Sequence, residues 1–130
     1  ISFGVSKIKK GLQKKLRLGN IKAKRDWGHA KDYVEAMWLM LQQKKPDDFV
    51  IGTGTEHSVE DFAKKAFAHV GLNYKDYVIS DKNLFRPAEV DTLLADSSKA
   101  KKILKWKPKI SFDDLVANMV DHDMEQINNI

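Results

Sequence analysis

Two arginines stand in loop-like segments that could bind an anion. Arg25 lies in the stretch KRDWGH at residues 24–29, and Arg86 lies in FRPAE at residues 85–89. Each has an acidic residue one or three positions later and adjoins a predicted helix or strand end, where ligands are often held. A planar guanidinium can donate two parallel hydrogen bonds to a phosphate, so two arginines from different loops would grip a diphosphate.

A structural explanation of these residues stays open. On spacing alone, a surface ion pair between Arg25 and Asp26 or Asp32 is the simpler account, because exposed pairs are common. The histidines show no metal-ligand spacing, and His29, at a predicted helix start, is interpreted as a structural residue. Zero cysteines exclude disulfides, thiol catalysis and thiolate metal sites.

A glycine-containing segment invites comparison with a dinucleotide-binding turn. That turn needs three glycines after a strand, for the tight turn, the approach to the pyrophosphate and the helix packing. The stretch from Gly52 to Gly54 supplies two, and His57 stands where the third would be. We interpret this segment as a turn from a strand to a helix.

The net charge of +5 raises the possibility of nucleic-acid binding. Basic residues concentrate at 7–25 and 99–109, but apolar residues at helical spacing are interleaved with them, and no aromatic-basic RNA-binding motif is present. We interpret most of these lysines as solvated helix faces, which leaves an anionic small ligand compatible.

Apolar periodicity predicts helices that would position the two arginine segments. Helices are expected at 3–15, 29–43 and 58–70, with a short helix through 100–104 and a last helix capped by Ser111. The buried face of the second should comprise Tyr33, Val34, Met37, Trp38 and Leu41. Ser58 followed by Asp61 indicates a capping box, with Gly71 ending that helix, and the last helix should bury Leu115, Val116, Met119 and Val120.

Short strands are expected between these helices, at 16–18, 49–51, 77–79 and 92–95. The alternation of strands and helices predicts an α/β chain of one unit. The continuous apolar run at 49–51 is expected to be a buried strand that completes a parallel sheet whose other strands lie elsewhere. Such an unpaired strand would leave apolar surface exposed and favour self-association.

Long motifs across the chain resemble one enzyme family. The run AKRDWGHAKDYVEAMW at residues 23–38, with LGN at 18–20, is similar to the GDP-mannose 4,6-dehydratases at nearly every position. FRPAEVD at 85–91, DSSKA at 96–100 and WKP at 106–108 continue the similarity in the family's order. The resemblance covers essentially the whole chain and corresponds to about the C-terminal third of the family's length.

The resemblance implies the C-terminal, nucleotide-sugar-binding part of an extended short-chain dehydrogenase, spanning residues 1–130. NADP would be bound by an N-terminal Rossmann region that is absent, as are a Tyr-x-x-x-Lys couple and the family's threonine-glutamate pair. By the same resemblance Arg25 and Arg86 contact the GDP diphosphate, and Glu89 contacts the ribose or an adjacent polar group. Lys15, Asn20 and Lys24 lie at the guanosine end, while Asp26 holds the arginine.

For the whole enzyme, the resemblance implies conversion of GDP-mannose to GDP-4-keto-6-deoxymannose by a homo-oligomer that binds no nucleic acid. The residues of this chain are expected to hold the GDP part and to be inactive alone. A sister nucleotide-sugar epimerase or dehydratase is the first alternative, and a small basic module that binds nucleic acid or a protein partner is the second.

The start at Ile1 suggests a longer parent protein or a removed leader. Because the sequence contains no long apolar run, we expect a cytoplasmic protein without a membrane span.

Overall fold

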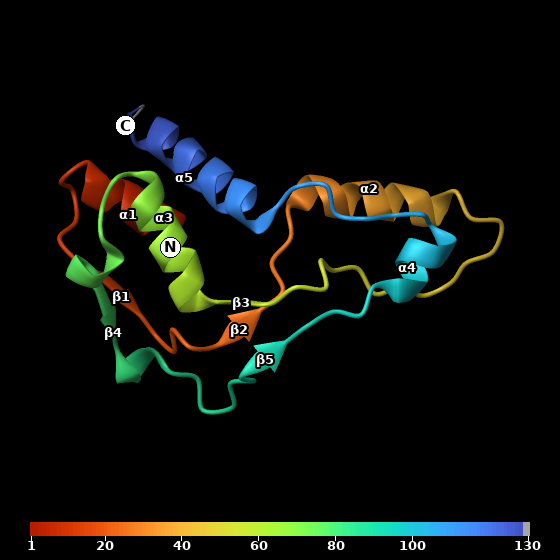
Figure 1. The fold of residues 1–130 in the computed structure, drawn as a ribbon, viewed down its shortest axis with the longest axis horizontal. Coiled ribbons are helices and arrows are strands. Elements are labelled where there is room, and N and C mark those ends of the chain that lie inside the picture. Colours follow the sequence, from red (N-terminus) through yellow and green to blue (C-terminus); the bar gives the residue numbers. More distant parts are fainter. Residues whose placement is uncertain (129–130) are drawn as a thin grey trace.

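The computed structural model describes residues 1–128 as helices and short strands arranged along one axis (Figure 1). The helices are α1 (Ser2–Lys9), α2 (Ala30–Leu41), α3 (Val59–His69), α4 (Ser98–Ile103) and α5 (Phe112–Asn128), with single 3-10 turns at Tyr74–Asp76 and Lys82–Leu84. The strands are β1 (Leu16–Leu18), β2 (Lys24–Arg25), β3 (His57–Ser58), β4 (Val78–Ser80) and β5 (Thr92–Leu93). The expected α/β composition is therefore present, with strands of only two or three residues.

The strands form two small sheets. β1 pairs in parallel with β4, with Leu16 opposite Val78. β2 lies at the centre of the other sheet, antiparallel to β3 and parallel to β5. The second sheet links the two ends of the molecule, because it joins the segments that lead to α2, α3 and α4 (Figure 1).

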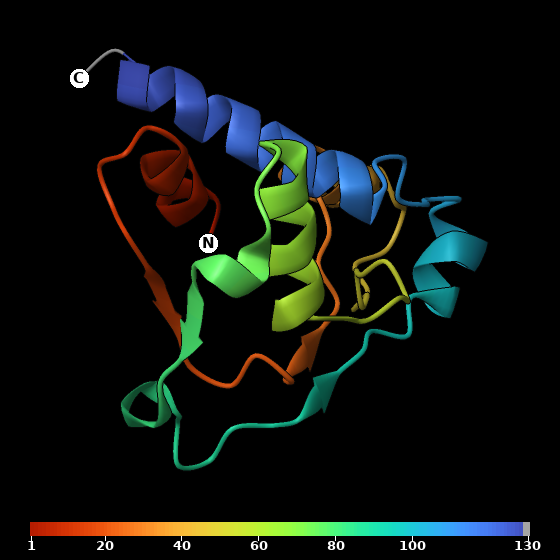
Figure 2. The same cartoon turned by 60° about the vertical axis from the view of Figure 1, so that its left-hand side comes forward.

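The larger core lies between α1, α3 and α5, which Figure 2 shows side by side. Its buried residues are Val5, Ile8, Phe62, Ala66, Phe67, Val116 and Val120. Apolar residues at three- and four-residue spacing place one face of each helix toward this core. The sequence predicted this face for α5, except that Met119 is 41% exposed.

A smaller core joins α2 to α4. It contains Ala36, Ala100, Leu104 and Trp106. The indole Nε1 of Trp106 donates a hydrogen bond of 2.8 Å to the backbone oxygen of Asp32, so the N–H group of this buried ring has an acceptor. The Asp32 carboxylate accepts from the backbone N–H groups of Lys109 and Ile110, both at 3.0 Å, and so holds this segment against α2.

The predicted buried face of α2 is wrong for most of its residues. Val34, Met37, Trp38 and Leu41 are between 59% and 82% exposed, whereas Ala36 is fully buried. Periodicity identified the apolar side of the helix correctly, but none of the other elements within residues 1–128 covers that side. Ala36 is the α2 residue buried in the contact with α4 and Trp106, and Tyr33, Leu39 and Met40 pack beside it while partly exposed.

The predicted strand at 49–51 is also absent from residues 1–128. Phe49 and Ile51 pack beside the smaller core, while Val50 is 56% exposed. Within residues 1–128 the segment has no strand neighbour, and a strand requires backbone hydrogen bonds to one.

The first helix is also shorter than predicted. It ends at Lys9, and Gly11 follows with φ of 74°, a conformation that commonly ends a helix. Leu12, beyond this end, is 67% exposed.

The predicted helix caps are confirmed, whereas the strand expected at 92–95 comprises only Thr92–Leu93. Ser58 and Asp61 form the capping box of α3, and Gly71 has φ of 73° just after its end. The Ser111 hydroxyl accepts from the backbone N–H of Asp114 at 3.1 Å at the start of α5. Among the helices of residues 1–128, none combines the length and the apolar character needed to cross a membrane.

Candidate functional site

Strand β2 fixes the direction of the first arginine. Lys24 pairs with Ser58 of β3 and with Thr92 of β5, and Arg25 pairs with His57 and Leu93 in the same way. Successive side chains of a strand point to opposite faces. Lys24 and Arg25 therefore diverge: the Lys24 ammonium lies 3.0 Å from Glu56 Oε1, whereas the Arg25 guanidinium turns toward residues 89–90.

The Arg25 side chain is held by the segment before β5. Its Nη1 donates to the backbone oxygen of Val90 at 2.8 Å and to that of Lys24 at 2.7 Å. Its Nη2 lies 3.4 Å from Glu89 Oε1, with both side chains at least three-quarters buried. These contacts fix the guanidinium in one orientation, which favours binding because less rotamer freedom is lost when a ligand arrives.

The second arginine belongs to the same segment. The backbone N–H of Glu89 donates to the backbone oxygen of Arg86 at 3.3 Å, so the turn at 86–89 joins Arg86 to the residue that contacts Arg25. The Arg86 side chain is exposed and makes no hydrogen bond or ion pair with any of residues 1–128. Its donors are therefore available to a ligand.

Both arginines line one surface pocket of about 250 Å³. The pocket is also lined by Leu18, Gly19, Asn20, Ala23, Val59, Leu84 and Glu89. Two guanidinium groups face a single carboxylate there, so the excess charge is positive. Since arginine is not deprotonated in proteins, this arrangement suits the binding of an anion rather than proton transfer.

Close backbone packing brings the two sides of the pocket together. A Cβ atom added at Gly19 would lie 2.7 Å from the backbone oxygen of Leu84, so only glycine permits this approach. The Ser80 hydroxyl donates to the Gly19 oxygen at 3.0 Å. The segment after β1, which carries Asn20, therefore lies next to the segment that carries Arg86.

The structure brings together four of the six residues predicted to bind the ligand: Asn20, Arg25, Arg86 and Glu89. It does not bring Lys15 or Lys24 to this pocket. The Lys15 ammonium donates to the backbone oxygen of Asp76 at 2.6 Å, before β1 rather than after it. Lys24 points toward Glu56 on the opposite face of β2, because neighbouring side chains of a strand alternate between its two faces.

Asp26 does not hold the arginine, which corrects the expectation from the sequence. Its carboxylate accepts from the backbone N–H groups of Thr53, Gly54 and Ala95 and from the Thr53 hydroxyl. The partner of Arg25 is Glu89 instead, and neither Asp26 nor Asp32 pairs with it among the described contacts. Asp26 thus joins the glycine-containing turn to the segment that follows β5.

The Gly52–Gly54 segment bends at Gly54 and leads into β3, so it is not the turn from a strand to a helix that the sequence predicted, although its role is structural. Its N–H groups at Thr53 and Gly54 are directed at Asp26, and Gly52 packs against Ala95. These donors are the groups that a dinucleotide turn directs at a pyrophosphate. His29 is also structural: its Nδ1 accepts from the backbone N–H of Lys31 at 3.1 Å and caps α2.

Several pocket residues were not predicted to line the site. Leu18, Gly19, Ala23, Val59 and Leu84 contribute apolar surface or backbone to it. Gly19, directly after a predicted strand, was the one with a recognisable signal, since glycine there indicates close backbone approach. Within residues 1–128, no three histidine, aspartate or glutamate side chains come close enough together to hold a metal ion.

Comparison with known proteins identifies the family of the sequence. The family model described as GDP-mannose 4,6 dehydratase matches residues 1–119. GDP-mannose 4,6 dehydratase 1 of Arabidopsis thaliana is 59% identical over 125 residues, which cover 96% of this chain and 35% of the relative. GDP-mannose 4,6 dehydratase of Homo sapiens is 49% identical over 142 residues, which cover 96% and 38%. The chain spans little more than a third of these relatives.

Solved structures share the fold. RMD from Pseudomonas aeruginosa complexed with NADPH superposes with a TM-score of 0.86 at 17% identity, over 96% of this chain and 41% of that one. The dTDP-glucose 4,6-dehydratase of Bacillus anthracis in complex with NAD gives 0.78 at 23% identity, over 96% and 38%. At such identities the similarity establishes the α/β fold alone.

Proposed function

Because the chain belongs to the GDP-mannose 4,6-dehydratase family, we propose that its arginine-lined pocket binds the diphosphate of GDP-mannose. The observation that carries this proposal is the convergence of Arg25 and Arg86 on one pocket from segments far apart in the sequence. Glu89 restrains Arg25, and Arg86 retains free donors for the ligand. Bidentate hydrogen bonds from two guanidinium groups match the charge and the geometry of a pyrophosphate.

The chain would then supply the nucleotide-sugar-binding part of a dehydratase. Gripping GDP provides binding energy remote from the reacting sugar carbons, which is how an enzyme enforces one substrate pose. We propose that NADP is held outside residues 1–130. The Gly52–Gly54 turn does not fit that cofactor, because its N–H groups already bind Asp26.

The remaining features of the proposal follow the family. The whole enzyme would convert GDP-mannose to GDP-4-keto-6-deoxymannose, as a cytoplasmic homo-oligomer. The isolated chain should bind GDP but show no dehydratase turnover. Measurable formation of the keto sugar by residues 1–130 alone, with NADP added, would contradict this division of labour.

Calorimetric titration with GDP, GDP-mannose, UDP and dTDP tests the proposal directly. We expect binding of both GDP ligands, and Arg86→Ala should weaken it about tenfold or more, as for a lost charge-assisted hydrogen bond. Arg17→Ala is the matched control, because Arg17 is an exposed arginine that pairs with Asp81 and does not line the pocket. Its affinity should equal that of the unaltered chain.

The two arginines should differ in a second measurement. Arg86→Ala should leave the thermal unfolding midpoint unchanged, since that side chain has no partner within residues 1–128. Arg25→Ala should lower the midpoint as well as the affinity, because Val90 and Glu89 lose a donor.

The choice of ligand separates the alternative functions. Equal affinity for UDP or dTDP would favour a sister enzyme. A salt-dependent affinity for generic DNA or RNA above that for GDP would favour a basic binding module.

A further inference from the structure

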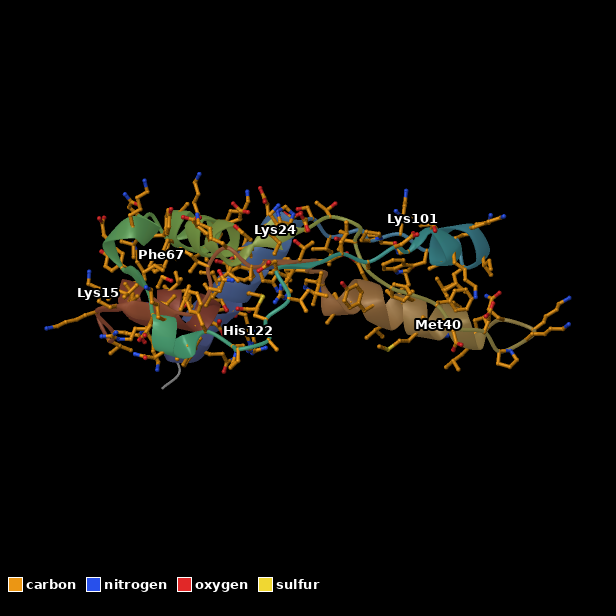
Figure 3. The ribbon with its side chains drawn as sticks, turned by 90° about the horizontal axis from the view of Figure 1, so that it is seen from below. Lys15, Lys24, Met40, Phe67, Lys101 and His122 are labelled. Atoms are coloured by element: carbon orange, nitrogen blue, oxygen red, sulfur yellow. The ribbon has the colours of Figure 1, made fainter. Side chains whose placement is uncertain are left out.

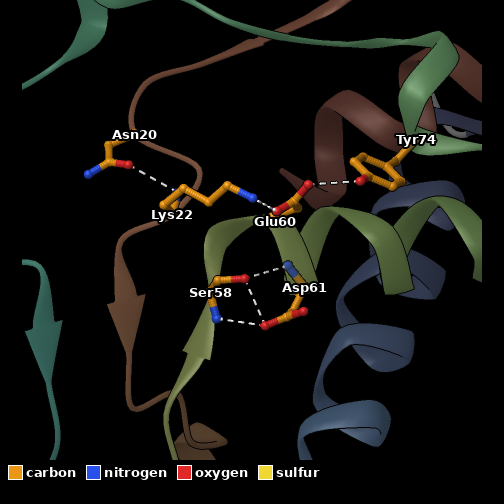
Figure 4. Close-up of polar contacts among 6 residues, drawn as sticks. All are labelled: Asn20, Lys22, Ser58, Glu60, Asp61 and Tyr74. Carbon is orange, nitrogen blue, oxygen red and sulfur yellow. Dashed lines mark hydrogen bonds and ion pairs between the residues drawn. The ribbon is translucent and has the colours of Figure 1, made fainter.

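The turn at residues 20–23 carries Asn20 to the edge of the pocket. The Asn20 Oδ1 accepts from the backbone N–H of Lys22 at 3.0 Å, which closes a small side-chain turn. With Oδ1 engaged in this way, the amide nitrogen of Asn20 is the end left free, and it points away from Lys22 in Figure 4. Asn20 therefore offers a donor, rather than an acceptor, to whatever occupies the pocket.

Helix α3 holds the carbonyl groups of this turn. The backbone N–H of Glu60 donates to the oxygen of Ile21 at 2.9 Å, and that of Val59 donates to the oxygen of Ala23 at 3.0 Å. The first N–H groups of a helix have no partner within the helix itself. Here they are satisfied by the turn, so the position of the turn depends on the start of α3.

The Glu60 side chain adds a second attachment. One carboxylate oxygen lies 2.5 Å from the Lys22 ammonium, and the other accepts from the Tyr74 hydroxyl at 2.8 Å (Figure 4). Glu60 thus contacts the turn through both its backbone and its side chain, while Tyr74 fixes the orientation of the carboxylate. Hydrogen bonds from Lys22 and Tyr74 lower the pKa of Glu60, which keeps the group ionised.

We propose that Glu60 is a positioning residue for nucleotide binding, which acts through Lys22 and the 20–23 turn to present the Asn20 amide donor to an acceptor atom of GDP. This inference rests on the proposed function of the pocket. An exposed ion pair alone contributes little to stability, and Lys22 is exposed. The effect of Glu60 should therefore fall on the orientation of Asn20, and on affinity, more than on folding.

A double-mutant cycle on GDP affinity tests this mechanism. Glu60→Gln keeps the shape of the side chain but removes the charge, and Asn20→Ala removes the presented amide. Each should weaken binding roughly threefold to tenfold, and the double variant should bind about as weakly as Asn20→Ala alone, because coupled residues are not additive. Glu56→Gln is the matched control: Glu56 pairs with Lys24 outside the pocket, and its affinity should be unchanged.

Amide hydrogen exchange in the ligand-free chain gives a readout that a general loss of stability would not produce. The Lys22 N–H should exchange faster in Glu60→Gln, while amides in the middle of α3 keep their rates. Tyr74→Phe removes only the hydroxyl donor. It should weaken GDP binding and speed exchange of the Lys22 N–H, each by less than Glu60→Gln does. It also serves as the test variant if Glu60→Gln does not fold.

The outcomes separate the two proposals. If Arg86→Ala weakens GDP binding but Glu60→Gln has no effect, or its effect adds fully to that of Asn20→Ala, the positioning role is wrong and the proposed function stands. Uniformly faster exchange throughout α3 would also reject the positioning role, because Glu60 would then act on the fold as a whole. A chain that binds no GDP overturns both proposals together.

Discussion

Asp26 shows how one carboxylate can organise the surroundings of a binding residue without touching it. It stands next to Arg25, yet its oxygens accept from Thr53, Gly54 and Ala95. These donors lie on either side of β2, so the carboxylate joins two loops that flank the strand. A carboxylate with this many partners is costly to lose, because each donor would remain without an acceptor.

Substitution Asp26→Asn should destabilise the fold by about 1–3 kcal/mol at neutral pH, since an amide cannot accept from all of these donors. Guanidinium-induced unfolding measures the change. The exposed residue Asp91, whose carboxylate makes no hydrogen bond within residues 1–128, is the control, and Asp91→Asn should have little effect. Equal stability of Asp26→Asn and the unaltered chain would show that the contacts are replaceable.

The same residue should contribute to the acid sensitivity of the protein. Burial acts to raise the pKa of Asp26, but the hydrogen bonds from Thr53, Gly54 and Ala95 outweigh it and hold the pKa below 3.8. A lowered native pKa means that the stabilisation is present above the unfolded pKa and is lost as the pH falls through the native one. Stability of the unaltered chain should therefore decline below about pH 4, and Asp26→Asn should show a shallower decline.

At the scale of elements, the start of α3 has two functions. Ser58 and Asp61 satisfy each other's backbone N–H groups, and the Ser58 side chain also lowers the pKa of Asp61. The next free N–H groups, at Val59 and Glu60, hold the 20–23 turn. The helix end that is stabilised by local capping is thus also the support for one side of the pocket.

Removal of the cap should weaken α3 measurably. Ser58→Ala is expected to cost about 1 kcal/mol of unfolding free energy, the usual value for an N-cap, while Ser58→Thr should retain most of it. Chemical denaturation of the three proteins provides the comparison. An alanine variant as stable as the threonine variant would mean that the backbone contacts to the turn suffice to start the helix.

At the scale of the whole molecule, the uneven distribution of cores leaves apolar surface uncovered. Figure 3 shows an extended molecule, with Phe67 of the larger core near one end and Met40 and Lys101 near the other. The α2–α4 end has few buried residues. As a result Met37, Trp38 and Leu41 of α2 remain more than half exposed on one helix face.

This face should make the chain self-associate, because contiguous exposed apolar surface favours burial against another molecule. Trp38→Lys should weaken any dimer about tenfold or more and reduce the fluorescence of a bound hydrophobic dye, as expected for a large aromatic contact. Leu12→Lys alters a 67% exposed apolar side chain away from α2 and is the control. Sedimentation velocity measures the association; a monomer without dye binding would contradict the prediction.

The sequence alone determined the features that depend on neighbours within a few residues. The start of α3, its end near Gly71 and the cap at Ser111 were predictable, because a helix cap is a contact between residues close in sequence. Periodicity predicted most of the buried face of α5 for the same reason, with Met119 as the exception. The long family motifs also predicted the family and four of the residues that line the pocket: Asn20, Arg25, Arg86 and Glu89.

Only the tertiary structure decided which of these residues meet. The partner of Arg25 is Glu89, and the partners of Asp26 include Ala95, all far apart along the chain. Strand pairing between β2 and β5 sets these contacts and directs Lys24 away from the pocket, while exposure of the α2 face depends on what lies beside it. Side-chain type and local spacing specify what a residue can bind, whereas long-range backbone pairing specifies where it points, and hence what it does bind.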